Sequence, residues 1–138
     1  MIISKEFEFS YAHRLLNHPG ECKNLHGHNG KLVLSLEGEV NKETGMVVDF
    51  GLLKVFWEKE LKPSLDHIVI LNRSDTMVLD GSNKYTIILG EPTCENIVKF
   101  INERIQKNIK GYFPNIYRII ITVFETERSF ASETYEIS

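Results

Sequence analysis

The segment from Thr93 to Gly111 constrains the fold most, because it carries an isoleucine at every fourth position. The apolar row consists of Ile97, Ile101, Ile105 and Ile109. This spacing predicts an amphipathic helix that starts near Thr93 and stops at Gly111. Its single apolar stripe must be covered by another element, so we expect the helix to lie on a sheet.

A second amphipathic helix is predicted to begin after Asp49. The segment 41–45 is a polar turn, and Asp49 is a good N-cap for a helix that follows it. Pro63 is expected to mark the end of this helix. The apolar positions at helical spacing are Leu52, Leu53, Phe56, Trp57 and Leu61.

The strands predicted around these helices indicate the fold class. Residues 31–39 alternate, with Leu32, Leu34 and Leu36 on one face, as in a half-buried strand. Further strands are expected at residues 2–9, 85–89, 117–125 and 131–137. The order predicts an α+β fold with a largely antiparallel sheet. No glycine-rich loop joins a strand to a helix, which argues against a parallel nucleotide-binding fold.

Length, charge and cysteine content indicate the number of domains, the kind of partner and the cellular compartment. The 138 residues suit one continuous domain over residues 1–138. A net charge of −3, from 16 basic and 19 acidic residues, argues against a nucleic-acid partner. No apolar stretch approaches the roughly 20 residues needed to cross a bilayer. The two cysteines fit a reducing compartment, so we expect a cytoplasmic protein.

Four of the five histidines fall between positions 13 and 28. In extended backbone His26 and His28 project to the same face, and His13 could supply a third imidazole. Three neutral imidazoles with a vacant fourth position are typical of catalytic zinc, which polarises a bound oxygen. The alternative is a set of unrelated polar or core histidines. We assign His18 to a Pro-Gly turn outright.

Five other side chains are candidates for a functional or a structural role. Cys22, four residues before His26, could be a thiolate base or a small core residue, and Cys94 is expected to be the latter. The pair Asp66 and His67 could relay protons, or Asp66 could be a turn or cap residue. Glu125 ends an apolar strand, where it could bind two N–H donors of a planar ligand or simply be solvated.

Taken together, these segments resemble the 6-pyruvoyltetrahydropterin synthase and 6-carboxytetrahydropterin synthase family. They run in the order of the family from about residue 7 to residue 126. The matching stretches are Phe9-Ser10-Tyr11-Ala12-His13-Arg14-Leu15, Cys22-Lys23-Asn24-Leu25-His26-Gly27-His28-Asn29, Val48-Asp49-Phe50-Gly51, Leu65-Asp66-His67 with Leu71-Asn72, Pro92-Thr93-Cys94-Glu95-Asn96, and Phe124-Glu125-Thr126.

The resemblance implies a role for each matching residue. It makes Zn²⁺ the cofactor and implies three groups of site residues. These are His13, His26 and His28 as zinc ligands, Cys22, Asp66 and His67 for proton transfer, and Thr93, Cys94 and Glu125 for binding the pterin. Glu125 would anchor the amino and ring nitrogens, whereas Thr93 and Cys94 would act partly through the main chain.

The resemblance also implies an architecture and an assembly. The expected T-fold is an antiparallel four-stranded sheet with two helices on one face. Such chains trimerise into a barrel and usually pair into a hexamer, with active sites between the subunits of the homo-oligomer.

The implied substrate is 7,8-dihydroneopterin triphosphate. We favour a 6-carboxy-5,6,7,8-tetrahydropterin synthase, a lyase that releases acetaldehyde and triphosphate on the route to queuosine. The runner-up is a 6-pyruvoyltetrahydropterin synthase, which eliminates triphosphate on the route to biopterin. A non-catalytic zinc- or pterin-binding module is a third interpretation.

The sequence departs from the family at three places. Gly30 stands where an aromatic residue is frequent, Glu21 lies beside Cys22, and the segment 66–72 is one residue longer than the short family form. Candidate cations for the triphosphate, each also interpretable as a solvated surface charge, are Arg14, Lys23, Lys54 and Arg128.

Overall fold

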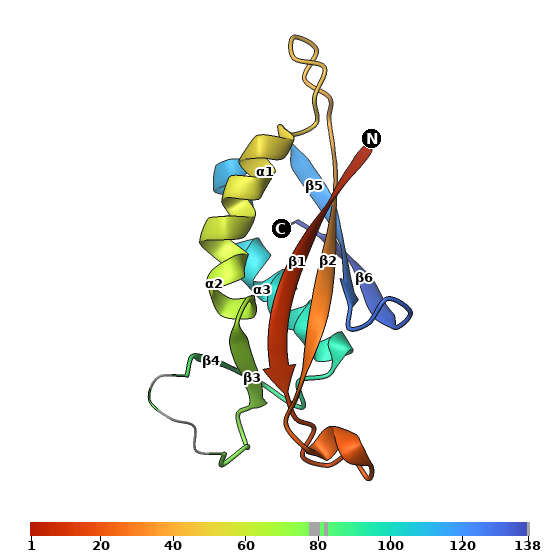
Figure 1. Cartoon of the computed structure of the whole chain (residues 1–138). Coiled ribbons are helices and arrows are strands. Elements are labelled where there is room, and N and C mark those ends of the chain that lie inside the picture. The colour runs from red at the N-terminus through yellow and green to blue at the C-terminus, as the bar shows by residue number, and fades with distance from the viewer. Residues whose placement is uncertain (78–80, 82, 138) are drawn as a thin grey trace.

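Six strands form one curled sheet in the computed structural model, which describes residues 1–77, 81 and 83–137. The order of the strands across the sheet is β4-β3-β1-β2-β5-β6 (Figure 1). The strands are β1 (Ile2–His13), β2 (His26–Gly38), β3 (Ile68–Asn72), β4 (Tyr85–Ile88), β5 (Ile116–Phe124) and β6 (Phe130–Glu136).

The α+β prediction is confirmed, but the prediction of a four-stranded, antiparallel sheet is too narrow. Strands β1, β2, β5 and β6 do pair antiparallel. Strand β3 adds to β1 in parallel, and β4 adds to β3 in parallel, so the sheet is mixed. The chain reaches β3 through a helical crossover, which is the type of connection that parallel neighbours require.

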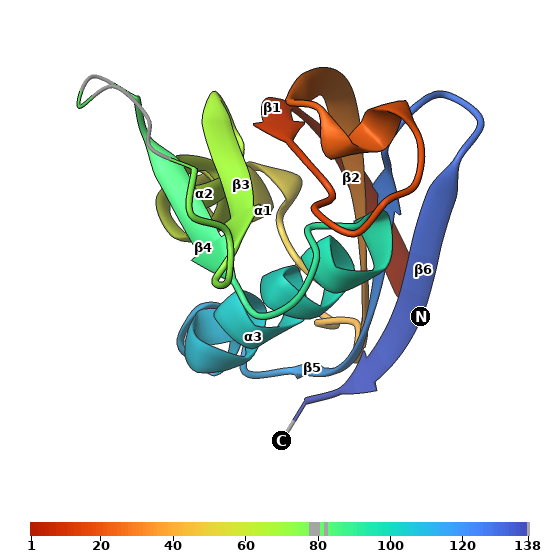
Figure 2. The same cartoon turned by 90° about the horizontal axis from the view of Figure 1, so that it is seen from below.

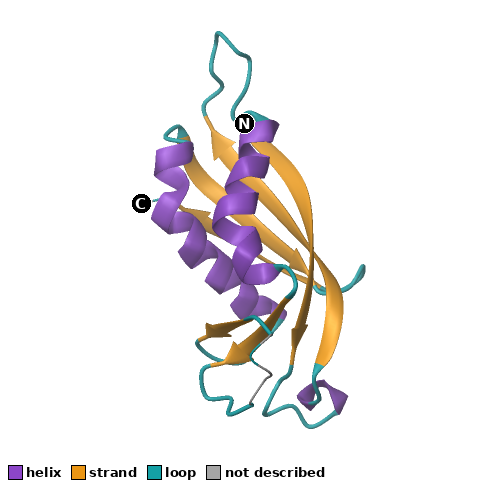
Figure 3. Cartoon of the chain, turned by 60° about the vertical axis from the view of Figure 1, so that its left-hand side comes forward, coloured by secondary structure: helices purple, strands orange, loops and turns teal. Residues whose placement is uncertain are grey.

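Two helical elements lie side by side on one face of this sheet (Figure 3). The first is a continuous rod made of three segments, and the second is a single long helix. A short helical turn, η1 (Glu21–Lys23), lies in the loop between β1 and β2. The rod contains α1 (Phe50–Phe56), η2 (Trp57–Leu61) and α2 (Lys62–Leu65), and the long helix is α3 (Cys94–Tyr112). Among the described residues, none of the helices combines the length and apolar character that a membrane crossing requires.

The ends of the helices partly differ from the sequence-based expectation. Asp49 and Thr93 cap α1 and α3 as predicted, with side chains that accept from Gly51 N and Asn96 N. Pro63 does not end the rod, because it falls in the first turn of α2, where a backbone N–H needs no helical acceptor. Gly111 likewise lies inside α3, which continues to Tyr112.

The core lies between the sheet and the two helical elements. All four isoleucines of the predicted stripe on α3 are fully buried, and the strands curve around this helix (Figure 2). Trp57 of the rod stacks on Phe7 of β1, with ring centroids 4.9 Å apart. Leu52 was expected on the buried face of the rod, but 43% of its surface is exposed.

Candidate active site

The rows of side chains that face the helices change from apolar to polar at one end of the sheet. In β1 the row Phe7, Phe9 and Tyr11 ends at His13, which pairs with His26 of β2. His28 pairs with Tyr11 in the same row. In β5 the buried row continues one alternate position beyond Val123 to Glu125. The alternation of three strands therefore brings polar groups to one place.

The three histidines form a compact cluster. The candidate ligand atoms of His13, His26 and His28 all lie within 4.8 Å of one another. The ring centroids are 4.6 Å apart for His13 and His26, 5.1 Å for His13 and His28, and 5.0 Å for His26 and His28. A single metal ion can be reached by all three side chains from such an arrangement.

Hydrogen bonds define the protonation of two of these rings. His13 Nδ1 lies 2.7 Å from Pro92 O, and His26 Nδ1 lies 2.7 Å from Asn24 O. A carbonyl oxygen only accepts, so each Nδ1 carries the proton and each neutral ring keeps a lone pair on Nε2. Burial lowers the pKa of His13 and of His28, which favours the neutral form that binds metals.

The Nε2 atoms of His13 and His28 are buried and have no hydrogen-bond partner. Glu125 Oε1 lies 3.4 Å from the first and 3.5 Å from the second. A carboxylate oxygen beside two imidazole nitrogens is stable only when a proton or a cation lies among them. The donor set therefore fits a zinc ion, with three nitrogen ligands and space for another group.

The Asp66–His67 pair is fastened to β1 by the backbone of Ser10. Asp66 Oδ1 accepts from Ser10 N at 2.9 Å, and His67 N donates to Ser10 O at 2.6 Å. Asp66 Oδ2 lies 3.0 Å from His67 Nδ1, while 82% of the His67 side chain is exposed. Burial alone would raise the pKa of Asp66, but the bonds from Ser10 and His67 bring it below its ordinary value.

His67 also has a left-handed backbone, with φ of 57°, which is uncommon for a residue other than glycine. Strain of this kind persists where the surroundings hold a residue in place, and it is frequent at functional sites. Here the hydrogen bonds to the backbone of Ser10 hold His67 and Asp66 in place.

Two cavities connect these groups. One of about 940 Å³ is lined in part by His28, Asp66 and Glu125, and another of about 490 Å³ is lined in part by His28 and His67. Cys22 lines neither of these two cavities. It is half-buried on η1, in the loop that leads from β1 to β2 at the same end of the sheet (Figure 1).

The side chains of Thr93 and Cys94 have structural partners. Thr93 Oγ1 accepts from Asn96 N at the start of α3. The buried Cys94 thiol donates to Val123 O at 3.0 Å, and burial raises its pKa to about 11. Burial disfavours the thiolate of Cys94, which is the nucleophilic form of a cysteine.

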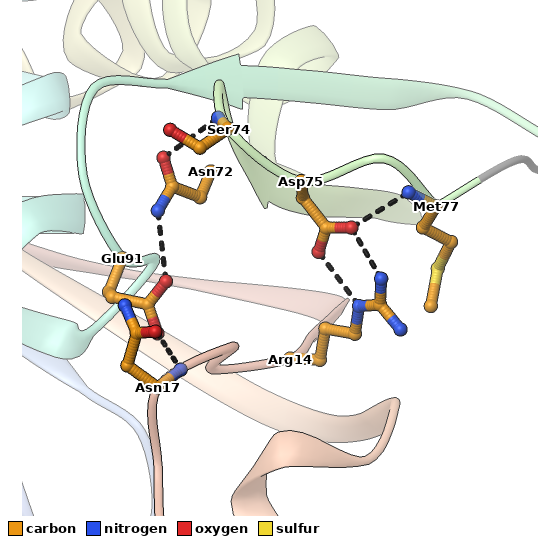
Figure 4. Close-up of polar contacts among 7 residues, drawn as sticks. All are labelled: Arg14, Asn17, Asn72, Ser74, Asp75, Met77 and Glu91. Atoms are coloured by element: carbon orange, nitrogen blue, oxygen red, sulfur yellow. Dashed lines mark hydrogen bonds and ion pairs between the residues drawn. The ribbon is translucent and has the colours of Figure 1, made fainter.

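Sequence reasoning missed a bracing network around Glu91 (Figure 4). Glu91 Oε1 accepts from Asn72 Nδ2 at 2.9 Å, and Glu91 Oε2 accepts from Asn17 N at 3.2 Å. Nearby, Arg14 donates two hydrogen bonds to Asp75, whose side chain is fully buried. Arg14 is thus engaged in an ion pair, which weakens its candidacy as a cation for the triphosphate. No local pattern signals these contacts, because the partners lie far apart in sequence.

The comparison with known sequences decides the family. The 6-pyruvoyl tetrahydropterin synthase family matches residues 2–136. The chain belongs to this family. Two relatives named 6-carboxy-5,6,7,8-tetrahydropterin synthase show how similar in sequence this chain is to other proteins. The protein of Haemophilus influenzae is 34% identical over 114 residues, covering 75% of this chain and 81% of the relative. That of Rickettsia typhi is 28% identical over 132 residues, covering 92% and 95%.

Solved structures of the family share this fold. A catalytic-residue mutant of Plasmodium vivax 6-pyruvoyltetrahydropterin synthase superposes with a TM-score of 0.77 over 99% of both chains, at 23% identity. At that identity the likeness concerns the fold alone. The curled sheet with two helices is therefore a fold that this chain shares with solved 6-pyruvoyltetrahydropterin synthases.

Proposed function

We propose that this family member is a zinc-dependent 6-carboxy-5,6,7,8-tetrahydropterin synthase. It converts 7,8-dihydroneopterin triphosphate and water to 6-carboxytetrahydropterin, acetaldehyde and triphosphate, on the route to queuosine. The convergence of three imidazoles and Glu125 beside a cavity of about 940 Å³ carries the proposal. The names of the Haemophilus influenzae and Rickettsia typhi relatives support this choice of product.

In this proposal His13, His26 and His28 hold the metal through Nε2. A zinc ion bound there supplies Lewis-acid chemistry, which makes the protons of the substrate side chain easier to remove. The backbone carbonyls that accept from His13 and His26 keep both rings in the ligating tautomer.

Glu125 holds the substrate ring. A carboxylate offers two acceptor oxygens, which match the adjacent amino and ring N–H donors of a pterin. The main chain of Thr93 and Cys94 directly follows Pro92, whose carbonyl accepts from His13, and in this proposal it contacts the pterin.

Cys22, Asp66 and His67 move protons. Cys22 removes a proton from the substrate side chain as its thiolate, and the exposed imidazole of His67, oriented by Asp66, returns or removes another.

We further propose that residues 1–138 form one T-fold domain that works in the cytoplasm as a trimer or hexamer. Within the described sheet, β4 and β6 are edge strands, so each is free to pair with a neighbouring copy. The exposed His67 side chain suits a site that a second subunit completes.

Product analysis tests the proposed function. The zinc-loaded protein is incubated with 7,8-dihydroneopterin triphosphate beside a zinc-stripped sample, and the products are separated by mass. We expect 6-carboxytetrahydropterin and acetaldehyde only with zinc. A 6-pyruvoyl product would assign the alternative synthase activity, and retention of unaltered pterin would indicate a binding module.

A further inference from the structure

The hydroxyl of Tyr11 is buried beside the three histidines without a hydrogen-bond partner. Only 4% of the residue surface is exposed. In the part of the chain that the structure describes, five buried side-chain polar atoms lack a partner, and three of them belong to Tyr11, His13 and His28. The other two lie on α3. Unpaired polar atoms therefore concentrate at the candidate site.

Glycine at position 30 makes room for this ring. Tyr11 stacks on Phe9 with centroids 5.2 Å apart, and its edge meets His13 at 5.2 Å. A Cβ atom at Gly30 would lie 3.0 Å from Tyr11 Cε1 and 3.1 Å from Phe9 Cζ. The Tyr11 ring thus occupies the space that a side chain at position 30 would need.

The Tyr11 ring and the Glu125 carboxylate contact the same two histidines. Lys31 pairs with Phe124 at the end of β5, so the antiparallel register places Gly30 opposite Glu125. Glu125 Oε1 contacts the Nε2 atoms of His13 and His28, and both of these rings contact Tyr11. The phenol hydroxyl of Tyr11 is a hydrogen-bond donor.

A buried hydroxyl without a partner lowers the stability of the fold, and a phenylalanine would avoid this loss. Such a group is retained where it acquires a partner in another state of the site. Glu125 is an acceptor-only group beside the same two histidines, and its Oε1 lies against their Nε2 atoms in this structure.

We propose that Tyr11 is a positioning residue for Glu125. In the substrate-bound site its hydroxyl donates a hydrogen bond to the Glu125 carboxylate and holds that carboxylate against the two N–H donors of the pterin ring. This inference rests on the proposed function. A hydrogen bond to a charged acceptor of this kind changes ligand affinity by about tenfold or more.

The variant Tyr11→Phe tests this role, because it keeps the ring and removes only the hydroxyl. We expect two opposite changes, measured on the zinc-loaded protein. The thermal midpoint should rise, and the Kd for 7,8-dihydroneopterin, measured by fluorescence titration, should increase about tenfold. Zinc affinity should stay unchanged. The matched control is Tyr112→Phe, which removes a hydroxyl that donates to Glu60 between the helices and should leave pterin affinity unaltered.

A double-mutant cycle with Glu125→Gln separates action through Glu125 from a direct contact. If the hydroxyl works through the carboxylate, Tyr11→Phe should have little further effect in the Glu125→Gln background. The same tenfold loss in both backgrounds, or equal pterin affinity of Tyr11→Phe and wild type, would overturn the proposal. If the wild-type protein bound no dihydroneopterin, both the role of Tyr11 and the proposed function would be overturned. If the wild-type protein binds dihydroneopterin, the proposed function stands whatever the affinity of Tyr11→Phe.

Discussion

Replacing Glu91 by alanine should weaken both the fold and the metal centre, because this carboxylate braces the segment that supports His13. Its two oxygens accept from Asn72 Nδ2 and from Asn17 N. The next residue, Pro92, supplies the carbonyl that accepts from His13 Nδ1 at 2.7 Å. One side chain therefore joins the end of β3 and the loop after β1 to the backbone that orients a candidate metal ligand.

The expected loss of stability depends on how far each of the two donors is buried. Asn72 is only 8% exposed, so its amide would lose a partner that water cannot readily replace, at a cost of about 1–3 kcal/mol. Asn17 is exposed, so water can replace its partner with little loss. A total of about 2 kcal/mol corresponds to a decrease of roughly 6–10 °C in Tm for a chain of this length.

The assay is thermal unfolding of the metal-free protein, followed by zinc titration of the same samples. Glu91→Ala should also lower zinc affinity by up to about tenfold, because loss of an outer-shell partner costs about 10–100-fold and Glu91 acts one residue farther away. The control is Glu103→Ala, an exposed carboxylate on α3, which should change stability by no more than about 0.5 kcal/mol. A Tm equal to that of wild type would refute the bracing role.

Three further outcomes are expected. Cys22→Ala should reduce turnover by about 10²–10⁴-fold while zinc affinity stays constant, and near-full turnover would remove Cys22 from the mechanism. Cys94→Ala should lose about 1 kcal/mol of stability, because the thiol that donates to Val123 O is buried, yet it should retain turnover within a few-fold. Because burial lowers the pKa of His13 and His28, protons should begin to compete with zinc only below the ordinary histidine value of about 6.5. Zinc titrations between about pH 5 and pH 7.5 check this, and a loss of affinity that begins above pH 7 would contradict it.

Local periodicity explains which parts of the fold could be predicted. The alternation of Leu32, Leu34 and Leu36 and the four-residue repeat of α3 place side chains on one face regardless of the rest of the chain. Strand β3 was missed because Ile68-Val69-Ile70-Leu71 is a continuous apolar run, which has no alternation to distinguish a strand from a buried helix. Its parallel pairing depends on a long-range crossover that no local pattern encodes.

The same distinction applies to the candidate site. His26 and His28 could be placed on one face from their spacing alone, and Glu125 continues the alternation of β5. Tyr11 reads as an ordinary core aromatic, because only the three-dimensional arrangement shows that its hydroxyl lacks a partner. The Glu91 network joins residues separated by 19 and 74 positions, and such pairings depend on tertiary structure.

A zinc titration of the metal-free protein tests the three-histidine centre most directly. Calorimetry of wild type should show one zinc ion per chain. Loss of an outer-shell partner weakens metal binding by up to about 100-fold, and His28→Ala should weaken zinc binding by more than this because it removes a ligand. His18→Ala should bind like wild type, because His18 is exposed and accepts only from Gly20 N. Absence of zinc binding by wild type, or equal affinity of His28→Ala and His18→Ala, would contradict the central claim that His13, His26 and His28 form a metal centre.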